Sequence, residues 1–124
     1  MSLPVTSLTA AIAAIMLIVL TMITGLRRRD TNTSLGHGTD ETLLRRIRAH
    51  GNFTEQVPMA LILLGLCEMA GVGSTMLWVI AGLLIIGRLL HAAGILGAMI
   101  PARAVGMLMT LGSILTGAVM LLTT

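Results

Sequence analysis

The sequence predicts an all-α integral membrane protein, a four-transmembrane-helix bundle that forms a single membrane domain over residues 1–124. Hydrophobic residues make up 56% of the chain, charged residues make up only 10%, and the mean hydropathy is +0.98. A water-soluble domain has about a quarter of its residues charged, and a chain this short cannot bury so much apolar surface in one core. The lipid bilayer is therefore the expected solvent for most of this surface.

Four apolar stretches, 3–26, 53–70, 75–96 and 101–122, define the predicted spans. Each is long enough, or nearly so, to cross ~30 Å of hydrocarbon as a helix that rises ~1.5 Å per residue. The first is interpreted as a true span, because no positive charge precedes it and it is longer than the apolar part of a signal peptide. The second helix is expected to begin in water near residue 40, with Thr39 or Asp40 as its N-cap.

The arginines predict the orientation of the spans. Six of them lie between the first and second stretches, whereas the 70–74 turn and both ends of the chain contain no basic residue. Because cytosolic loops are enriched in Lys and Arg, we expect the 27–40 loop in the cytosol and both termini on the non-cytosolic side.

Small residues spaced four apart indicate where the helices pack closely. Ala10 and Ala14 form such a pair in the first stretch, and Ser113 and Gly117 form another in the fourth. Without a hydrophobic driving force between helices in lipid, small residues favour association by letting backbones approach.

Several function classes are excluded by composition. All eight basic residues are arginine, and one Phe, one Trp and no Tyr leave almost nothing for stacking on bases, so no nucleic-acid partner is expected. The single Cys67 allows no internal disulfide. His37, His50 and His91 lack metal-ligand spacing, and we therefore predict no metal site.

The start of the second helix contains the most informative polar pattern. Arg45, Arg48, Asn52 and Glu55 follow one another at spacings of three, four and three, which places them on one face of a helix. One interpretation is an arginine-rich helix end that meets lipid headgroups. The position of Glu55 argues against it, since an anionic lipid surface has no use for a carboxylate deeper than the arginines.

Further polar residues are expected at the same depth. Arg88 and His91 lie in the cytosolic half of the third span, and a buried arginine there needs a partner, for which Glu55 is the candidate. Glu68 is excluded because it falls at the outer end and on the opposite face of its helix, where solvation at the interface accounts for it. The residues predicted to converge are Arg27, Arg28, Arg29, Arg48, Asn52, Glu55, Arg88, His91 and Arg103. Such a set suits a small, mainly anionic molecule that also carries an amine.

The stretch RRIRAHGNFTEQVP, residues 45–58, resembles the signature of the MAPEG family, the membrane-associated proteins in eicosanoid and glutathione metabolism. The matching core, R-A-x-x-N-x-x-E-x-x-P, corresponds to Arg48, Ala49, Asn52, Glu55 and Pro58. The segment GRLLHAAG, residues 87–94, resembles the family's third span. The chain resembles bacterial members of the family and microsomal glutathione transferases, and this resemblance implies a location in a bacterial inner membrane.

The resemblance implies a homotrimer that binds glutathione as co-substrate, without a metal, in clefts between neighbouring subunits. Arg48, Asn52 and Glu55 would bind glutathione, together with Arg27 or Arg28 from the adjacent subunit. Arg103, which is offset by about one position from the family pattern, and Arg88 would be catalytic by stabilising the thiolate, which is the reactive form of a thiol. The expected activity is that of a transferase or peroxidase acting on lipophilic electrophiles or lipid hydroperoxides that arrive through the bilayer.

Two departures from the family pattern keep a second interpretation open. Gln56 and His91 stand where many relatives have tyrosine, and the chain contains no tyrosine that could donate a hydrogen bond to the sulfur. His91 is expected to line the glutathione site in its place. The alternative is a non-catalytic protein of the MAPEG type that binds glutathione, a lipid or a partner protein. An exporter of cationic drugs is disfavoured, because the first span has no acid and the arginines would repel cations.

Overall fold

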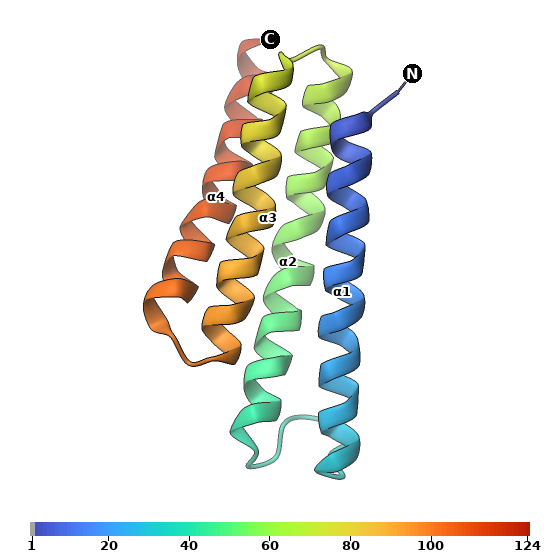
Figure 1. Cartoon of the computed structure of the whole chain (residues 1–124), viewed down its shortest axis with the longest axis vertical. Coiled ribbons are helices and arrows are strands. Elements are labelled where there is room, and N and C mark those ends of the chain that lie inside the picture. The colour runs from blue at the N-terminus through green and yellow to red at the C-terminus, as the bar shows by residue number, and fades with distance from the viewer. Residues whose placement is uncertain (1) are drawn as a thin grey trace.

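The computed structural model describes residues 2–124 and consists of four antiparallel helices (Figure 1). They are α1 (Pro4–Asp30), α2 (Glu41–Met69), α3 (Ser74–Leu96) and α4 (Ile100–Thr123). The all-helical prediction is confirmed. Both termini lie at one end of the bundle, and the α1–α2 loop and the α3–α4 turn lie toward the other, which we name the arginine-rich end.

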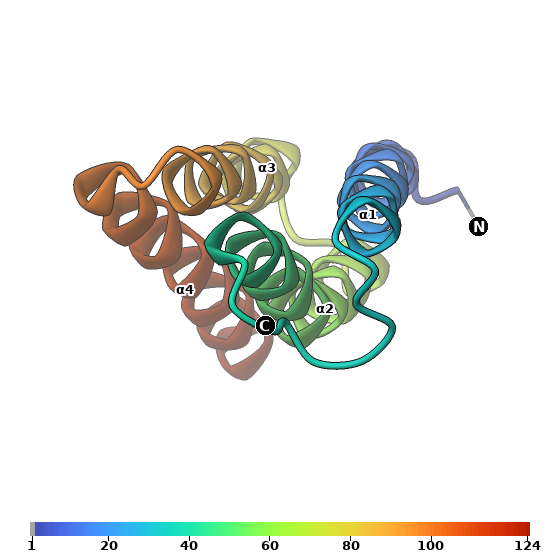
Figure 2. The ribbon, with the colours of Figure 1, turned by 90° about the horizontal axis from the view of Figure 1, so that it is seen from below.

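The helices differ in how apolar they are. Within the described residues, α1, α3 and α4 are each long and apolar enough to cross a membrane. Polar residues interrupt α2, but α2 contacts each of the other three helices, and the end view in Figure 2 shows it between α1 and α4. Much of its surface therefore faces protein rather than lipid, so α2 needs fewer apolar residues than a helix at the edge of the bundle.

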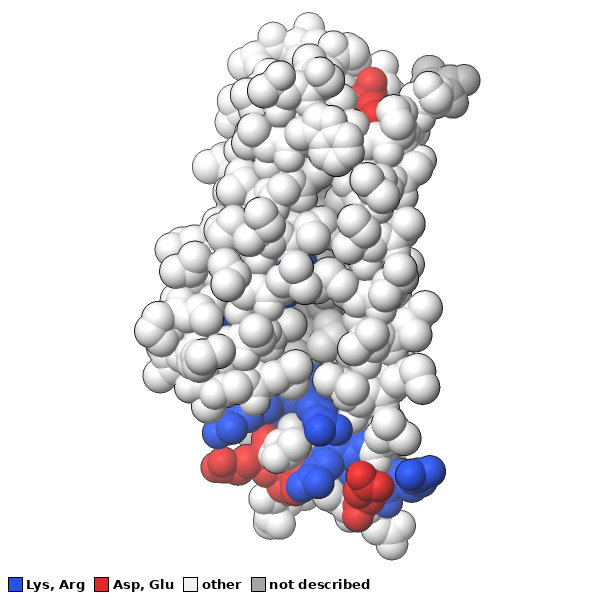
Figure 3. Space-filling model, in the orientation of Figure 1, with Lys and Arg blue, Asp and Glu red and all other residues white. Residues whose placement is uncertain are grey.

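Charge is distributed very unevenly along the bundle. In Figure 3, Arg, Asp and Glu side chains gather at the arginine-rich end, and the face above them is almost entirely uncharged. Large apolar side chains such as Ile15, Ile18, Leu108 and Leu115 are more than half exposed on α1 and α4. Such a surface is stable in contact with hydrocarbon and would aggregate in water.

The start of α2 follows the prediction from sequence. Asp40 is the N-cap residue, and its side-chain oxygen accepts a hydrogen bond from the Leu43 backbone amide at 2.6 Å. The same carboxylate pairs with the Arg27 guanidinium at 2.7 Å. The hydrogen bond from Arg27, and then that from Leu43, lower the pKa of Asp40 below its usual value. The stabilisation from this link is thus present at neutral pH and is lost as the pH falls through the lowered pKa.

Glu68 caps a different helix from its own. The first turn of α1 has no capping side chain of its own, and Pro4 has no backbone amide to satisfy. Glu68, near the end of α2, accepts hydrogen bonds from the Val5 amide at 3.0 Å and the Thr6 amide at 2.8 Å. Solvation alone, which the sequence suggested for Glu68, is therefore not its role. It satisfies two free amides and places a negative charge at the positive end of the α1 dipole.

The variant Glu68→Gln is expected to lower the free energy of unfolding by about 1 kcal/mol, because an amide retains only one of the two accepting oxygens and carries no charge. Thermal unfolding in detergent measures this. Glu41→Gln is the control, since the Glu41 side chain is 84% exposed in the first turn of α2 and does not cap a helix end. Equal melting temperatures for the two variants would contradict the capping role.

The two predicted small-residue pairs have different environments. Ser113 and Gly117 are buried, and the Ser113 hydroxyl donates to the Ile80 carbonyl oxygen at 2.8 Å, so close packing of α4 is confirmed. Ala10 and Ala14 instead line an apolar groove between α1 and α2, where Ala10 is half-buried and Ala14 is exposed. Close packing of another helix at this pair stays a prediction.

Candidate functional site

One face of α2 presents three polar residues toward the arginine-rich end. Arg48, Asn52 and Glu55 are at least partly accessible, whereas the intervening Ala49 and Phe53 are 1% and 4% exposed. The spacing of four and three places the polar residues on one stripe, and the apolar residues beside them pack into the core. Packing of Ala49 and Phe53 thus fixes the direction in which the polar stripe points.

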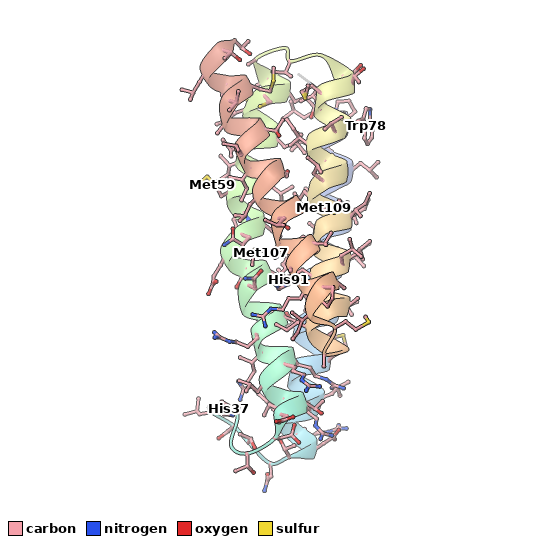
Figure 4. All side chains as sticks on the ribbon, turned by 90° about the vertical axis from the view of Figure 1, so that its left-hand side faces the viewer. His37, Met59, Trp78, His91, Met107 and Met109 are labelled. Carbon is pink, nitrogen blue, oxygen red and sulfur yellow. The ribbon has the colours of Figure 1, made fainter. Side chains whose placement is uncertain are left out.

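Glycine contacts between α3 and α4 bring two more polar residues to this stripe. A side chain at Gly94 would overlap the backbone of Arg103, and one at Gly106 would overlap the backbone of His91. Because only glycine permits such an approach, α3 and α4 lie in direct backbone contact here. His91 on α3 and Arg103 on α4 are consequently held close together. Figure 4 shows His91 between the levels of Met59 and His37.

These residues surround one cavity of about 340 Å³. That volume is within the range of ~300–1,000 Å³ that is typical of ligand sites. Gly51 contributes space, since a side-chain carbon added there would meet no atom within 4 Å. Gly51 was not predicted from the sequence, although it lies one turn before Glu55 on the same stripe. The lining residues are Ile47, Arg48, Gly51, Asn52, Glu55, His91, Ile95 and Arg103.

The charged groups of this cavity, on Arg48, Glu55 and Arg103, are exposed and available to a ligand, whereas His91 lines the cavity with only 2% of its surface exposed. Within residues 2–124, the side chains of Arg48, Glu55, His91 and Arg103 form no hydrogen bond, and none of them takes part in an ion pair. The cavity therefore contains two unpaired guanidinium groups, one carboxylate and an imidazole. A guanidinium binds carboxylates and other anions with two parallel hydrogen bonds, and a carboxylate binds an ammonium group.

Arg88 lies behind the cavity wall rather than on it. Its side chain is 2% exposed, and its Nη1 donates to Asn52 Oδ1 at 2.7 Å and to the Asn52 carbonyl oxygen at 3.3 Å. The predicted pairing of Arg88 with Glu55 was wrong. Glu55 is exposed and lies one helical turn beyond Asn52, which is the residue nearer to the guanidinium.

Arg27 and Arg28 do not line this cavity. Arg27 is paired with Asp40, and Arg28 Nη1 donates to the carbonyl oxygens of Gly36 at 2.7 Å and Thr33 at 3.3 Å. Both arginines thus order the α1–α2 loop of their own chain. Arg28 also borders a separate cavity of about 300 Å³ with His50 on the α1 side of α2.

Two further hollows adjoin the candidate site. A cavity of about 280 Å³ below the α3–α4 turn shares Ile95 and Arg103 with it and is also lined by Arg45 and the exposed Ile100. On the other side of α2, an apolar groove of about 310 Å³ includes Phe53, Val57 and Pro58. Arg103 therefore borders two cavities, one polar and one lined in part by apolar side chains of the turn.

No metal-binding arrangement is found in the part of the chain that the structure describes. A site would need at least three His, Cys, Asp or Glu side chains close together, and residues 2–124 contain no such group.

The comparisons with known proteins agree with this architecture. The model of the MAPEG family matches residues 6–123 of the chain. The chain is 31% identical over 90 residues to the inner membrane protein YecN of Escherichia coli strain K12, a match that covers 73% of this chain and 69% of YecN. YecN of Escherichia coli strain O6:H1 matches with the same identity and coverage. The apolar helices and these relatives together show that the chain is an integral membrane protein and belongs to the MAPEG family.

Proposed function

We propose that this protein is a glutathione-dependent membrane transferase or peroxidase that acts on lipophilic electrophiles or lipid hydroperoxides. The observation that carries the proposal is the one cavity in which α2, α3 and α4 bring together Arg48, Asn52, Glu55, His91 and Arg103. Four of these five side chains have no partner within residues 2–124.

The chemical groups of glutathione are complementary to the polar side chains of this cavity. Glutathione has two carboxylates, one ammonium group, two peptide units and a thiol. Arg48 would bind a carboxylate, Glu55 the ammonium group and Asn52 an oxygen of the tripeptide. Arg103, at the boundary with the neighbouring cavity, would then face the thiol, where a positive charge favours the thiolate.

The chemistry needs only a thiolate and an accessible electrophile. In the transferase reaction, the thiol releases its proton to water, and a sulfur electron pair forms a bond to the electrophilic carbon as the leaving group departs with its electrons. In the peroxidase reaction, the thiolate sulfur attacks the terminal oxygen of the hydroperoxide, the O–O bond breaks, and the alkoxide takes a proton from water and leaves as the alcohol, so that a sulfenic acid remains. A second glutathione then forms the disulfide and releases water, so the peroxide is reduced and two thiols are oxidised.

The position of Arg103 supports an approach of the second substrate from the bilayer. The cavity below the α3–α4 turn is bordered by Ile100, which is 78% exposed, and adjoins the polar cavity at Arg103. A lipophilic molecule would reach the sulfur from this side, while glutathione would enter from the aqueous end.

Glutathione binding to the detergent-purified protein, measured by calorimetry, tests the proposal first. A difference absorbance scan for the thiolate follows. Saturable binding together with a thiolate band at neutral pH is the expected result. Absence of any binding heat at millimolar glutathione would overturn the proposal.

A non-catalytic binding protein is the second candidate, because the chain contains no tyrosine that could donate a hydrogen bond to the sulfur. Such a protein would bind glutathione without a thiolate band and without turnover of a lipophilic electrophile. The two measurements above, with an activity assay, therefore separate the candidates.

We further propose that the protein is a homotrimer in which Arg27 or Arg28 of one subunit completes the site of its neighbour. The exposed Glu55 supports this, since a carboxylate at this depth is unfavourable against lipid and needs protein or water around it. Native mass spectrometry in detergent should show three chains. A stable monomer that binds glutathione with full affinity would contradict a site shared between subunits.

The orientation that we propose places the arginine-rich end in the cytosol of a bacterium and both termini on the other side of its inner membrane. It rests on six arginines at this end of the bundle, three in the last turn of α1 and three near the start of α2. Reporter fusions after Thr124 should be active only outside the cytosol. A cytosolic signal there would reverse the orientation and place the cavity at the outer surface.

A further inference from the structure

The contact between Arg88 and Asn52 fixes the direction of the Asn52 side-chain amide. A guanidinium has hydrogen-bond donors and no acceptor, so the group that Arg88 Nη1 meets at 2.7 Å must be the amide oxygen. The NH₂ group of Asn52 then points away from Arg88. It has no hydrogen-bond partner in the protein and is not among the buried unpartnered atoms of residues 2–124, so it is accessible. Since Asn52 lines the cavity, the accessible NH₂ lies there.

Arg88 is an energetically unfavourable residue at this buried position. Its Nε and Nη2 are buried without a partner, and no carboxylate lies within ion-pair distance of it in the described chain. A buried charge that lacks a counter-ion destabilises a fold, and an apolar side chain of similar volume would give a more stable protein. A contribution to stability therefore does not explain an arginine here, whereas its contact with Asn52 provides a role at the cavity.

We infer that Arg88 is a positioning residue, which holds the oxygen of Asn52 so that the cavity offers the ligand an NH₂ donor at this point. This inference rests on the proposed function and specifies its recognition. The ligand group beside Asn52 must be an oxygen acceptor, either a carboxylate or a peptide carbonyl. A ligand that presents an N–H there is rejected, because two donors would face each other.

The same geometry predicts that Asp cannot replace Asn at position 52 without loss of ligand binding. An aspartate would pair with Arg88 as a buried carboxylate and guanidinium, which is a stronger contact than the one observed. It would also present a second oxygen to the cavity in place of the NH₂ donor. Stability and ligand binding are thus expected to change in opposite directions.

Thermal unfolding in the absence of ligand tests the contact between Arg88 and Asn52. Asn52→Asp should raise the melting temperature of the protein purified in detergent, because Arg88 gains a counter-ion. In the Arg88→Gln background, Asn52→Asp should instead lower the melting temperature, since the new carboxylate is then buried without a cation. A fall of the same size in both backgrounds would overturn the assigned orientation.

The affinity for glutathione, measured by calorimetry, tests whether the NH₂ group of Asn52 donates a hydrogen bond to the ligand. Asn52→Asp should weaken binding about tenfold even though the protein melts at a higher temperature. Asn52→Leu, which removes the donor without adding a charge, should also weaken binding. Arg88→Lys, whose ammonium is also only a donor, should bind more tightly than Arg88→Gln, whose amide can accept the Asn52 NH₂ and allow it to turn.

These outcomes separate the inference from the proposed function. If the wild-type protein binds no glutathione, the proposed function fails, and the melting temperatures alone decide the orientation of Asn52. If the wild type binds glutathione and the folded Asp and Leu variants bind it equally well, the proposed function stands and the positioning role of Arg88 is overturned.

Discussion

Replacing Glu55 with glutamine is expected to weaken glutathione binding by about ten- to a hundredfold, which corresponds to a charge-assisted contact of roughly 1.5–3 kcal/mol. Glu55 is the one acidic residue among those that line the cavity, and it forms no ion pair within residues 2–124. Glutamine has nearly the same size but cannot neutralise the ligand ammonium group. Calorimetry on the purified variant measures the change.

A glutathione analogue that lacks the amino group isolates this contact. The analogue should bind the wild-type protein weakly, and Glu55→Gln should not weaken it further, because the group that Glu55 meets is already absent. Glu41→Gln is the matched control, since Glu41 lies on the same helix outside the cavity and is expected to leave affinity unchanged. An analogue that loses as much affinity as glutathione would show that Glu55 contacts another part of the ligand.

The helices and the polar stripe of α2 could be predicted because they depend on local spacing. A period of 3.6 residues places Arg48, Asn52 and Glu55 on one face whatever surrounds them, and the Asp40 side chain caps the same helix by accepting a hydrogen bond from a backbone amide of its first turn. The structure shows the same stripe along the cavity, and α2 begins within one residue of the predicted start.

The partner of Arg88 could not be predicted in the same way. Depth in the bundle is similar for Asn52 and Glu55, and charge alone favours the carboxylate. The rotation of α2 about its axis decides between them, and it is set by the packing of Ala49 and Phe53 in the core. Such packing depends on contacts between helices, which a spacing rule within one helix does not contain.

The close approach of α3 and α4 was missed for a related reason. Gly87 and Gly94 are seven apart and Gly106 lies on the next helix, so no pair in one helix has a spacing of four. Their contact appears only when both helices are placed side by side. It determines the site more directly than the predicted small-residue pairs do, because it holds His91 beside Arg103.

The variant Arg103→Ala is expected to reduce turnover about a hundredfold, as the loss of one group that stabilises a developing negative charge does in other enzymes. Glutathione affinity should change only a few-fold at neutral pH, where a thiol of pKa near or above ~8.5 is mostly protonated. The pH profile of turnover should move toward alkaline values, because without the guanidinium the thiolate forms only at higher pH.

Variants of two other arginines are the controls that show whether this effect is specific to Arg103. Arg45 lines the neighbouring cavity but not the polar one, so Arg45→Ala should leave the pH profile in place while it lowers the affinity for an acidic lipophilic substrate. Arg88 is buried behind the cavity wall, and Arg88→Ala should weaken glutathione binding through Asn52 without moving the profile. Full activity and an unchanged pH profile in Arg103→Ala would end the arginine–thiolate mechanism, whereas a shift in Arg88→Ala alone would transfer that role to Arg88.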